Sequence, residues 1–176
     1  MSRIAVVAAA LVLGACAPAE IRPQFTAVDF ELSGRLAARY QSESFTGNVA
    51  WKHARDADEM LISTPLGQGV ARIARQGNAV VLATAEPREY RATDVESLTE
   101  QVLGFRLPLA GLADWVRARP STDAPAQGDY APDGTLRSLE QRGWKIEFQE
   151  YDAGRPVRMR LLYPGIELRL AITQWK

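Results

Sequence analysis

The sequence predicts a mainly β fold with a few helices, in the form of an incomplete, half-open antiparallel β-barrel of about ten strands under a helical lid. Three observations predict it. Apolar and polar residues alternate through most segments before residue 92 and after residue 135, as in strands with one buried face. Two segments between these runs have helical periodicity. So many half-buried strands must curl, and the helices can then cover the concave side and enclose a hydrophobic cavity.

The first β-rich run begins at Val28. Its clearest alternation is in residues 45–51, where Phe45 and Trp51 share one parity and therefore one face of the strand. A tight turn at Gln76-Gly77-Asn78 joins two later strands. The expected strands of this run cover residues 28–40, 45–51, 59–63, 69–75 and 78–84, with a short extended piece at Tyr90.

Two helices are expected next. Thr93 can cap a helix over residues 94–103 that Gly104 ends. A second helix is expected over residues 109–118, and Pro120 ends it.

A surface loop and a second β-rich run follow. Residues 120–132 are rich in Pro, Asp, Ala and Gly, which is typical of a loop. The remaining chain predicts adjacent antiparallel strands over residues 135–141, 144–149, 158–163 and 166–173, and turns at Ala153-Gly154 and Pro164-Gly165 join the last three.

The N-terminus has the features of an exported chain. Within residues 1–15, Arg3 precedes ten uncharged, mostly apolar residues, which are too few to cross a bilayer but typical of a signal peptide. The sequence Leu13-Gly14-Ala15-Cys16 resembles the bacterial lipoprotein signal. That resemblance implies cleavage before Cys16, a thioether-linked S-diacylglycerol on its sulfur and an N-acyl group on its α-amine. The alternative is an ordinary signal peptide followed by an unpaired cysteine.

The mature chain then divides into two parts. Residues 16–27 contain the lipidated cysteine and a proline-containing tether, and residues 28–176 form a single domain. Ala17 follows the lipidated position, where an Asp commonly marks retention in the inner membrane. The resemblance therefore implies an anchor in the periplasmic leaflet of the outer membrane.

Composition excludes several classes of function. Lys and Arg total 21 and Asp and Glu total 21, which argues against a nucleic-acid binder that works by neutralising phosphates. One cysteine and one histidine leave no intramolecular disulfide and few catalytic or metal-binding arrangements. A lipid-anchored hydrolase is one alternative, but the chain lacks a Gly-x-Ser-x-Gly motif, and His53 is expected at a strand end near solvent, without a role.

The mature domain as a whole is similar to the LolB family of outer-membrane lipoprotein receptors. The resemblance rests on an ordered set of segments: Gly34-Arg35-Leu36, Phe45 to Trp51, Pro65-Leu66-Gly67, Tyr90 to Asp94, Leu107-Pro108-Leu109 with Leu112 and Trp115, Gly143-Trp144-Lys145, Tyr151-Asp152, and Ile172 to Trp175. It implies a half-barrel of about eleven strands. One position departs from the family, which often has a glycine where this chain has Ala118.

The resemblance also implies a function. The family accepts acylated lipoproteins from a soluble periplasmic carrier (LolA-like) by cavity-to-cavity transfer and inserts them into the outer membrane. The implied partners are acylated lipoprotein cargo, that carrier and outer-membrane phospholipid, with no nucleic acid. A monomer without enzymatic activity, cofactor or metal is expected. The alternative is a structural envelope lipoprotein that binds a protein partner and no acyl cargo.

Candidate site residues follow from both lines of reasoning. In the family, the leucine that matches Leu66 protrudes and helps place cargo in the membrane, which makes Pro65, Leu66 and Gly67 a membrane-insertion loop. From composition alone, Leu66 could equally pack on the core. Arg35 is expected to touch the lid helices or a lipid headgroup, or to be a solvated strand residue. The cargo-cavity candidates, for which ordinary core packing is the alternative, are Trp51, Trp115, Trp144, Phe148, Tyr163 and Leu168.

Overall fold

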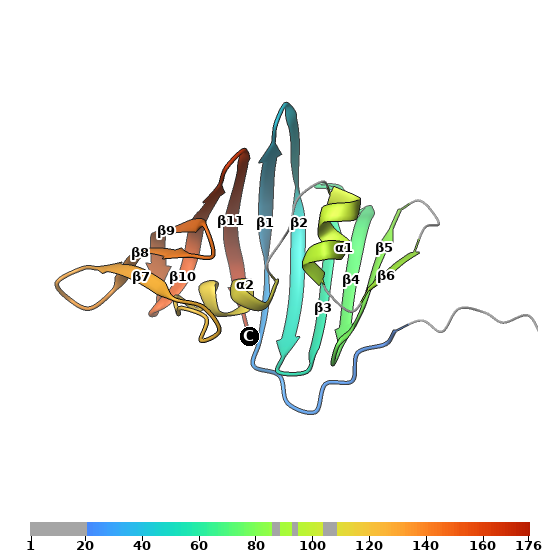
Figure 1. Ribbon diagram of the computed structural model, residues 1–176, viewed down its shortest axis with the longest axis horizontal. Coiled ribbons are helices and arrows are strands. Elements are labelled where there is room, and N and C mark those ends of the chain that lie inside the picture. Colours follow the sequence, from blue (N-terminus) through green and yellow to red (C-terminus); the bar gives the residue numbers. More distant parts are fainter. Residues whose placement is uncertain (1–20, 86–88, 93–94, 104–108) are drawn as a thin grey trace, which may run out of the picture.

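A computed structural model describes residues 21–85, 89–92, 95–103 and 109–176 of the chain (Figure 1). The strands are β1 (Phe30–Tyr40), β2 (Glu43–Ala54), β3 (Ala57–Ser63), β4 (Gly69–Gln76), β5 (Ala79–Thr84), β6 (Glu89–Ala92), β7 (Ala126–Tyr130), β8 (Leu136–Gln141), β9 (Trp144–Asp152), β10 (Arg155–Tyr163) and β11 (Ile166–Trp175). The helices are α1 (Val95–Leu103) and α2 (Leu109–Trp115).

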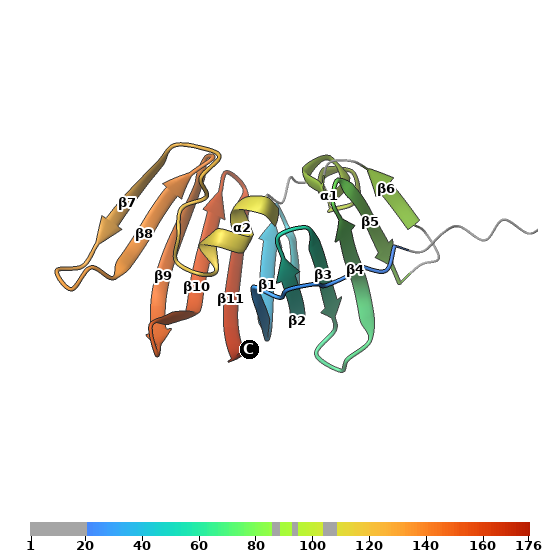
Figure 2. The same cartoon turned by 90° about the horizontal axis from the view of Figure 1, so that it is seen from below.

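All eleven strands belong to one antiparallel sheet in the order β6-β5-β4-β3-β2-β1-β11-β10-β9-β8-β7. Every pair of neighbours is also consecutive in sequence except β1 and β11, which join the first half of the chain to the second. The sheet stays open between its edge strands β6 and β7. Both helices lie on one side of the curled sheet (Figures 1 and 2). The predicted mainly β, half-open architecture is therefore confirmed.

Two glycines let neighbouring strands approach closely where the sheet bends. A Cβ on Gly34 would lie 2.2 Å from the carbonyl oxygen of Ala171, and a Cβ on Gly47 would lie 2.2 Å from that of Ser63. Gly34 also follows a register shift between β1 and β11, which increases local twist. These glycines allow the two halves of the sheet to curl toward one side.

Two predicted segments differ from the structure. The prediction of a loop throughout residues 120–132 is wrong, because β7 lies within it and pairs with β8. All five β7 residues are exposed, so the segment has no buried face to create an alternating pattern. The second helix ends at Trp115 instead of Ala118.

Ala118 follows a turn after α2 and has a positive φ of 54°. Its N–H bonds to the Trp115 carbonyl, and the Arg119 N–H bonds to the Asp114 carbonyl. A left-handed residue after a helix C-terminus is favourable for glycine, which accounts for the glycine that the family often has here.

Several predictions fall outside the described residues. They are the signal peptide, the lipidation of Cys16, the helix cap at Thr93 and the helix end at Gly104. In the part of the chain that the structure describes, no helix has both the length and the apolar character needed to cross a membrane.

Candidate functional site

A cavity of about 420 Å³ lies between α2 and the side of the sheet that the helices cover. Its walls come from β1 to β4, β10 and β11, and α2 closes it through Leu112 together with Val116 in the following turn. Its surface is almost entirely hydrocarbon, and the polar residues Glu43 and Ser44 lie where β2 begins. Such a lining suits an apolar chain, since each buried methylene contributes about 0.8 kcal/mol.

Strand alternation produces this lining. In β1, Leu32, Leu36, Ala38 and Tyr40 contribute side chains to the cavity, as expected for residues two apart along one face. Ala38 and, in β4, Ala71 occupy positions where a large side chain would fill the space. The cavity therefore exists because small residues stand on the inner face between larger apolar ones.

The cavity contains two of the six residues that the sequence suggested for it. Trp51 and Leu168 line it. Trp115, Trp144 and Phe148 are buried elsewhere in the core, and Tyr163 is 43% exposed at the end of β10. Trp115 donates from Nε1 to Gln141 Oε1 at 2.7 Å, and its ring lies 6.3 Å from that of Trp144. For the three buried aromatics, ordinary packing is what the structure shows.

Sequence reasoning missed most of the lining. Phe45 lies on the same face of β2 as Trp51, and Leu170 lies on the same face of β11 as Leu168. Leu36 and Ala38 lie on that face of β1, the strand between them. Strand alternation extended from Trp51 and Leu168 would therefore have predicted these residues. Selection by the size of aromatic side chains instead favoured Trp115, Trp144 and Phe148, which pack in the core.

The β3–β4 connection is a tight turn that presents a leucine to solvent. The Gly67 N–H bonds to the Thr64 carbonyl at 2.9 Å, which places Pro65 and Leu66 at the two central positions, and Pro is favoured at the first of them. Gly67 has a positive φ of 87°, and the side chain of Asn48 donates to the Thr64 carbonyl. Leu66 is 92% exposed. The alternative in which Leu66 packs on the core is not what the structure shows.

The β3–β4 turn at Pro65, Leu66 and Gly67, the predicted insertion loop, adjoins the cavity wall. Ile62, just before it, and Val70, just after it, both line the cavity. In Figure 2 the loop bends away from the side on which α1 and α2 lie. The exposed leucine thus stands on a turn whose two stems are part of the apolar lining.

Arg35 lies on the other face of β1. It is exposed, whereas the side chain of its neighbour Leu36 lines the cavity on the side that the helices cover. Since successive side chains of a strand point to opposite faces, Arg35 points away from α1 and α2. The expectation that it contacts the lid helices is corrected by this placement.

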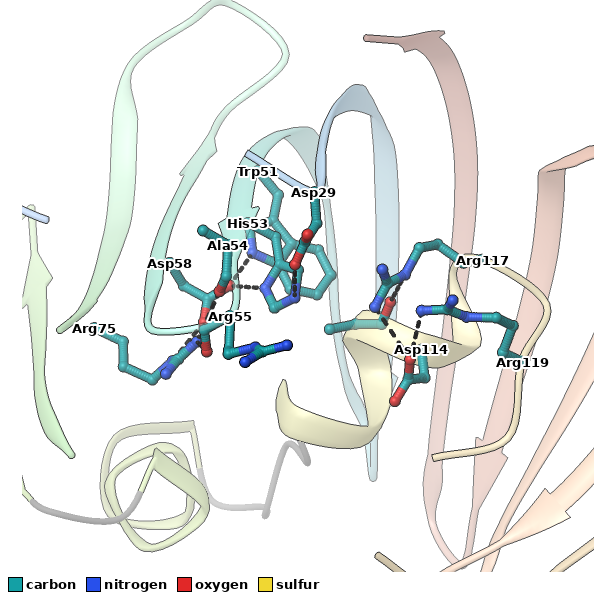
Figure 3. Close-up of polar contacts among 11 residues, drawn as sticks. Asp29, Trp51, His53, Ala54, Arg55, Asp58, Arg75, Asp114, Arg117 and Arg119 are labelled. Atoms are coloured by element: carbon teal, nitrogen blue, oxygen red, sulfur yellow. Dashed lines mark hydrogen bonds and ion pairs between the residues drawn. The ribbon is translucent and has the colours of Figure 1, made fainter. Parts of the chain in front are cut away.

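A buried polar cluster lies at the other end of β3 from the insertion loop (Figure 3). This end of the sheet, where β2 turns into β3, is called its base. Asp58 accepts from Trp51 Nε1 at 2.9 Å and from Arg75 Nε at 2.5 Å, and its Oδ1 lies 2.6 Å from His53 Nδ1. His53 Nε2 faces Asp29 Oδ2 at 3.8 Å. A carboxylate with this many partners is well compensated for burial.

The environment of His53 differs from expectation and bears on the hydrolase alternative. His53 is 8% exposed, so the expected position near solvent is wrong. Its ring stacks on Phe30 at 4.9 Å between centroids. Its two nitrogens face two carboxylates, and a general base would need one of them beside a nucleophile. Within the described residues, no cluster of three or more His, Cys, Asp and Glu side chains is arranged to hold a metal ion.

Contacts of Arg117, in the turn after α2, hold this helix over the sheet. The Arg117 guanidinium lies 5.4 Å from the centre of the Phe30 ring on β1 and donates to the Ala113 carbonyl. Burial is the main cause that lowers the pKa of Arg117, and Asp114 opposes it by pairing with Arg117 at 3.1 Å (Figure 3). These contacts fix the apolar side of α2 against the cavity.

Comparisons with known proteins give matches over nearly the whole predicted domain. The family model described as "Outer membrane lipoprotein LolB" matches residues 28–175. A protein of Thiobacillus denitrificans named outer-membrane lipoprotein LolB is 39% identical over 183 residues, covering 100% of this chain and 98% of the relative. A protein of Nitrosomonas europaea with the same name is 40% identical over 153 residues, covering 84% of this chain and 72% of the relative.

Solved structures show a related fold. A LolA superfamily protein from Nitrosomonas europaea aligns with a TM-score of 0.55 at 11% identity, covering 84% of each chain. A DUF1329 family protein from Desulfovibrio piger aligns with a TM-score of 0.53 at 8% identity, again covering 84% of each chain. At these identities the likeness concerns the fold alone.

Proposed function

The chain belongs to the LolB family, and from that premise we propose that it is a lipoprotein receptor of the outer membrane. In this proposal Cys16 carries the acyl anchor on the periplasmic face. The domain accepts acylated lipoproteins from a LolA-like carrier and inserts them into the membrane. It acts as a monomer, and its partners are that cargo, that carrier and outer-membrane phospholipid.

The observation that carries the proposal is the apolar cavity beside an exposed leucine. The cavity offers about 420 Å³ of hydrocarbon-lined space, and Leu66 stands 92% exposed on the turn between two of its wall strands. The first feature suits an acyl chain in transit, and the second suits contact with a bilayer.

Energetics explain why transfer must run from one cavity to another. An acyl chain with about 15 methylenes costs roughly 12 kcal/mol to expose to water. Release into the periplasm would therefore be far too slow, whereas a chain that slides between two touching cavities is never fully hydrated. Direction follows from differential affinity, since a partner that binds both states equally moves nothing. No covalent step is required.

The insertion loop completes the path. Burial of the Leu66 side chain in lipid contributes about 2 kcal/mol, which holds the loop at the interface. Because Ile62 and Val70 belong to both the cavity wall and the stems of the loop, an acyl chain can pass along apolar side chains toward the membrane.

A transfer assay tests the proposal. The carrier is loaded with a labelled acylated lipoprotein, and this protein is supplied in vesicles as wild type, Leu66→Glu or the control Leu61→Glu. Leu61 is also an exposed leucine, at 46%, but it lies within β3. We expect wild type and the control to deliver label to the bilayer, and Leu66→Glu to accept cargo but to insert it at least tenfold more slowly.

Two outcomes would contradict the proposal. If wild type takes no cargo from the carrier, a structural lipoprotein that binds a protein partner becomes the better account. If Leu66→Glu and wild type insert cargo equally fast, the insertion role of Leu66 is lost although the receptor role stands.

A further inference from the structure

The outer face of β1 carries two arginines that lack an acidic partner. Arg35 and Arg39 are both exposed, and neither guanidinium has an ion pair or a hydrogen bond among the residues that the structure describes. The same face has balanced charges farther toward the base of the sheet. There Lys52 pairs with Glu31 at 3.1 Å, and Arg72 pairs with Glu59 at 2.8 Å. The excess of positive charge is therefore local.

The neighbouring strands enlarge this cationic area. Arg169 of β11 lies directly opposite Ala37, so it is a diagonal neighbour of both Arg35 and Arg39 at about 7–8 Å. Arg160 of β10 is the next residue across the sheet. We call Arg35, Arg39, Arg160 and Arg169 the outer arginine patch.

The acidic residues within reach are already engaged. Glu167, opposite Arg39, accepts from Arg160 Nε and Arg169 Nε, each at 2.7 Å. Hydrogen bonds from these two arginines lower the pKa of Glu167, so it stays ionised. Glu147 lies 3.6 Å from Arg160 and 3.2 Å from Lys145. Glu43 lies opposite Tyr40 and lines the cavity together with it, so it is on the inner face of the sheet and not beside Arg35 and Arg39. The guanidinium groups of Arg35 and Arg39 remain available to an added anion.

The patch adjoins the insertion loop. Asn48 lies directly opposite Arg35 in the β1–β2 pair and donates from its side chain to the Thr64 carbonyl at 3.1 Å. The loop bends toward the side away from the helices (Figure 2), which is also the side that carries Arg35. One face of the molecule thus combines an exposed leucine with unpaired arginines.

We infer that the outer arginine patch binds the phosphate groups of anionic phospholipids while Leu66 is inserted in the same bilayer. A guanidinium presents a planar fork of donors that matches phosphate oxygens, and it loses less on dehydration than an ammonium group. Apolar insertion beside cationic residues is the combination that holds peripheral proteins at an anionic surface. The inference rests on the proposed function for the membrane orientation of Leu66 and for the acyl anchor on Cys16.

Arginine footprinting tests the inference on the full lipid-anchored chain without cargo. The protein is reconstituted in vesicles of zwitterionic phospholipid, alone or with one quarter anionic phospholipid, and treated with phenylglyoxal. Mass spectrometry follows each arginine. We expect anionic vesicles to slow modification of Arg35 and Arg39 by about fivefold, and high salt to abolish the difference. Arg55 and Arg137, which are exposed elsewhere, serve as internal controls and should not change.

Three results would overturn the inference. Equal modification of Arg35 and Arg39 in both kinds of vesicle would mean that the patch stays away from lipid. Equal protection by inorganic phosphate alone would assign it to a free anion. Protection that appears only when the carrier protein is added would assign it to protein docking. Since no cargo is present, the readout does not depend on whether transfer occurs.

A variant supplies an independent check. In the wild type, anionic vesicles should also protect Arg169 of the same patch. Arg35→Gln/Arg39→Gln should leave Arg169 equally reactive in the two kinds of vesicle, whereas the matched variant Arg55→Gln/Arg137→Gln should keep its protection. Loss of protection in both variants would show a general charge effect and would contradict a local patch.

Discussion

The inner side of the sheet has a packed region and a hollow region. Around β8 to β10, Trp115, Leu139, Ile146 and Met159 are almost completely buried, with exposures of 0–1%. Around β1 to β4, the lining residues Leu36, Ala38 and Ile62 are only half-buried and face the cavity. Both regions are built by the same strand alternation. The difference is therefore one of side-chain volume, since a tryptophan fills the space in one region and alanines leave it open in the other.

This contrast separates stability from binding. In the packed region, the side-chain amide of Gln141 is hydrogen-bonded through both its oxygen and its nitrogen. The oxygen accepts from Trp115 and from the Ser121 N–H, and the nitrogen donates to the carbonyls of Ser121 and Ala124. Such an arrangement holds one geometry. In the hollow region, the lining atoms lack contact partners on one side, which costs dispersion energy that an acyl chain can restore. We infer that the packed region holds the fold while the hollow region accommodates cargo.

The largest expected effect is a difference in stability between two Leu→Ala variants. Leu139→Ala should lower the free energy of unfolding by about 2–5 kcal/mol, because it opens a new cavity in a closely packed region. Leu36→Ala should lower it by only about 1 kcal/mol, because its side chain already borders empty space. Urea denaturation measures both. Equal losses would contradict the distinction between the two regions.

A smaller change in free energy should weaken binding in the hollow region. Ala38→Phe places a ring in the cavity, and we expect at least a tenfold weaker affinity for a fluorescent fatty acid. Ala37→Phe, one residue away on the outer face, is the matched control and should bind normally. A thermal melt of each variant shows whether the fold is kept. Normal binding by a folded Ala38→Phe protein would mean that acyl chains bind elsewhere.

The smallest effect is a pH dependence that belongs to the packed region. Tyr151 on β9 donates to the Leu136 carbonyl at 2.5 Å, and burial raises its pKa to about 12. A tyrosine in the unfolded chain titrates at about pH 10. The contribution of Tyr151 to stability is therefore complete below that pH and is lost as the pH rises toward about 12.

Melting temperatures across that interval test this point. They should fall more steeply for wild type than for Tyr151→Phe. Identical slopes would show that Tyr151 does not contribute to the loss of stability at high pH.

The parts of the molecule that alternate in sequence were predictable, and the parts that depend on volume or on remote partners were not. Residues 45–51 and 166–173 predicted strands because each buries one face. Strand β7 was not predicted, because an edge strand with every residue exposed pairs through its backbone but has no hydrophobic pattern.

The same distinction applies to the site. The turn at Pro65-Leu66-Gly67 has a local signature, and the structure places Leu66 in solvent. Trp115 and Trp144 looked like cavity residues because of their size, but size alone does not tell a filled space from an empty one. The burial of His53 depends on Asp58 and Asp29, and no single strand pattern brings these two carboxylates to it.

We propose that acyl chains occupy the cavity between α2 and the inner face of the sheet. Site-specific photocrosslinking tests this occupancy. A photoreactive amino acid is placed at Leu36, which lines the cavity, or at Ala37, which points to the outer face, and each protein receives radiolabelled acylated lipoprotein from the carrier. We expect crosslinks to the acyl chains from position 36 and none from position 37. Equal crosslinking from both positions, or crosslinking only from position 37, would contradict it.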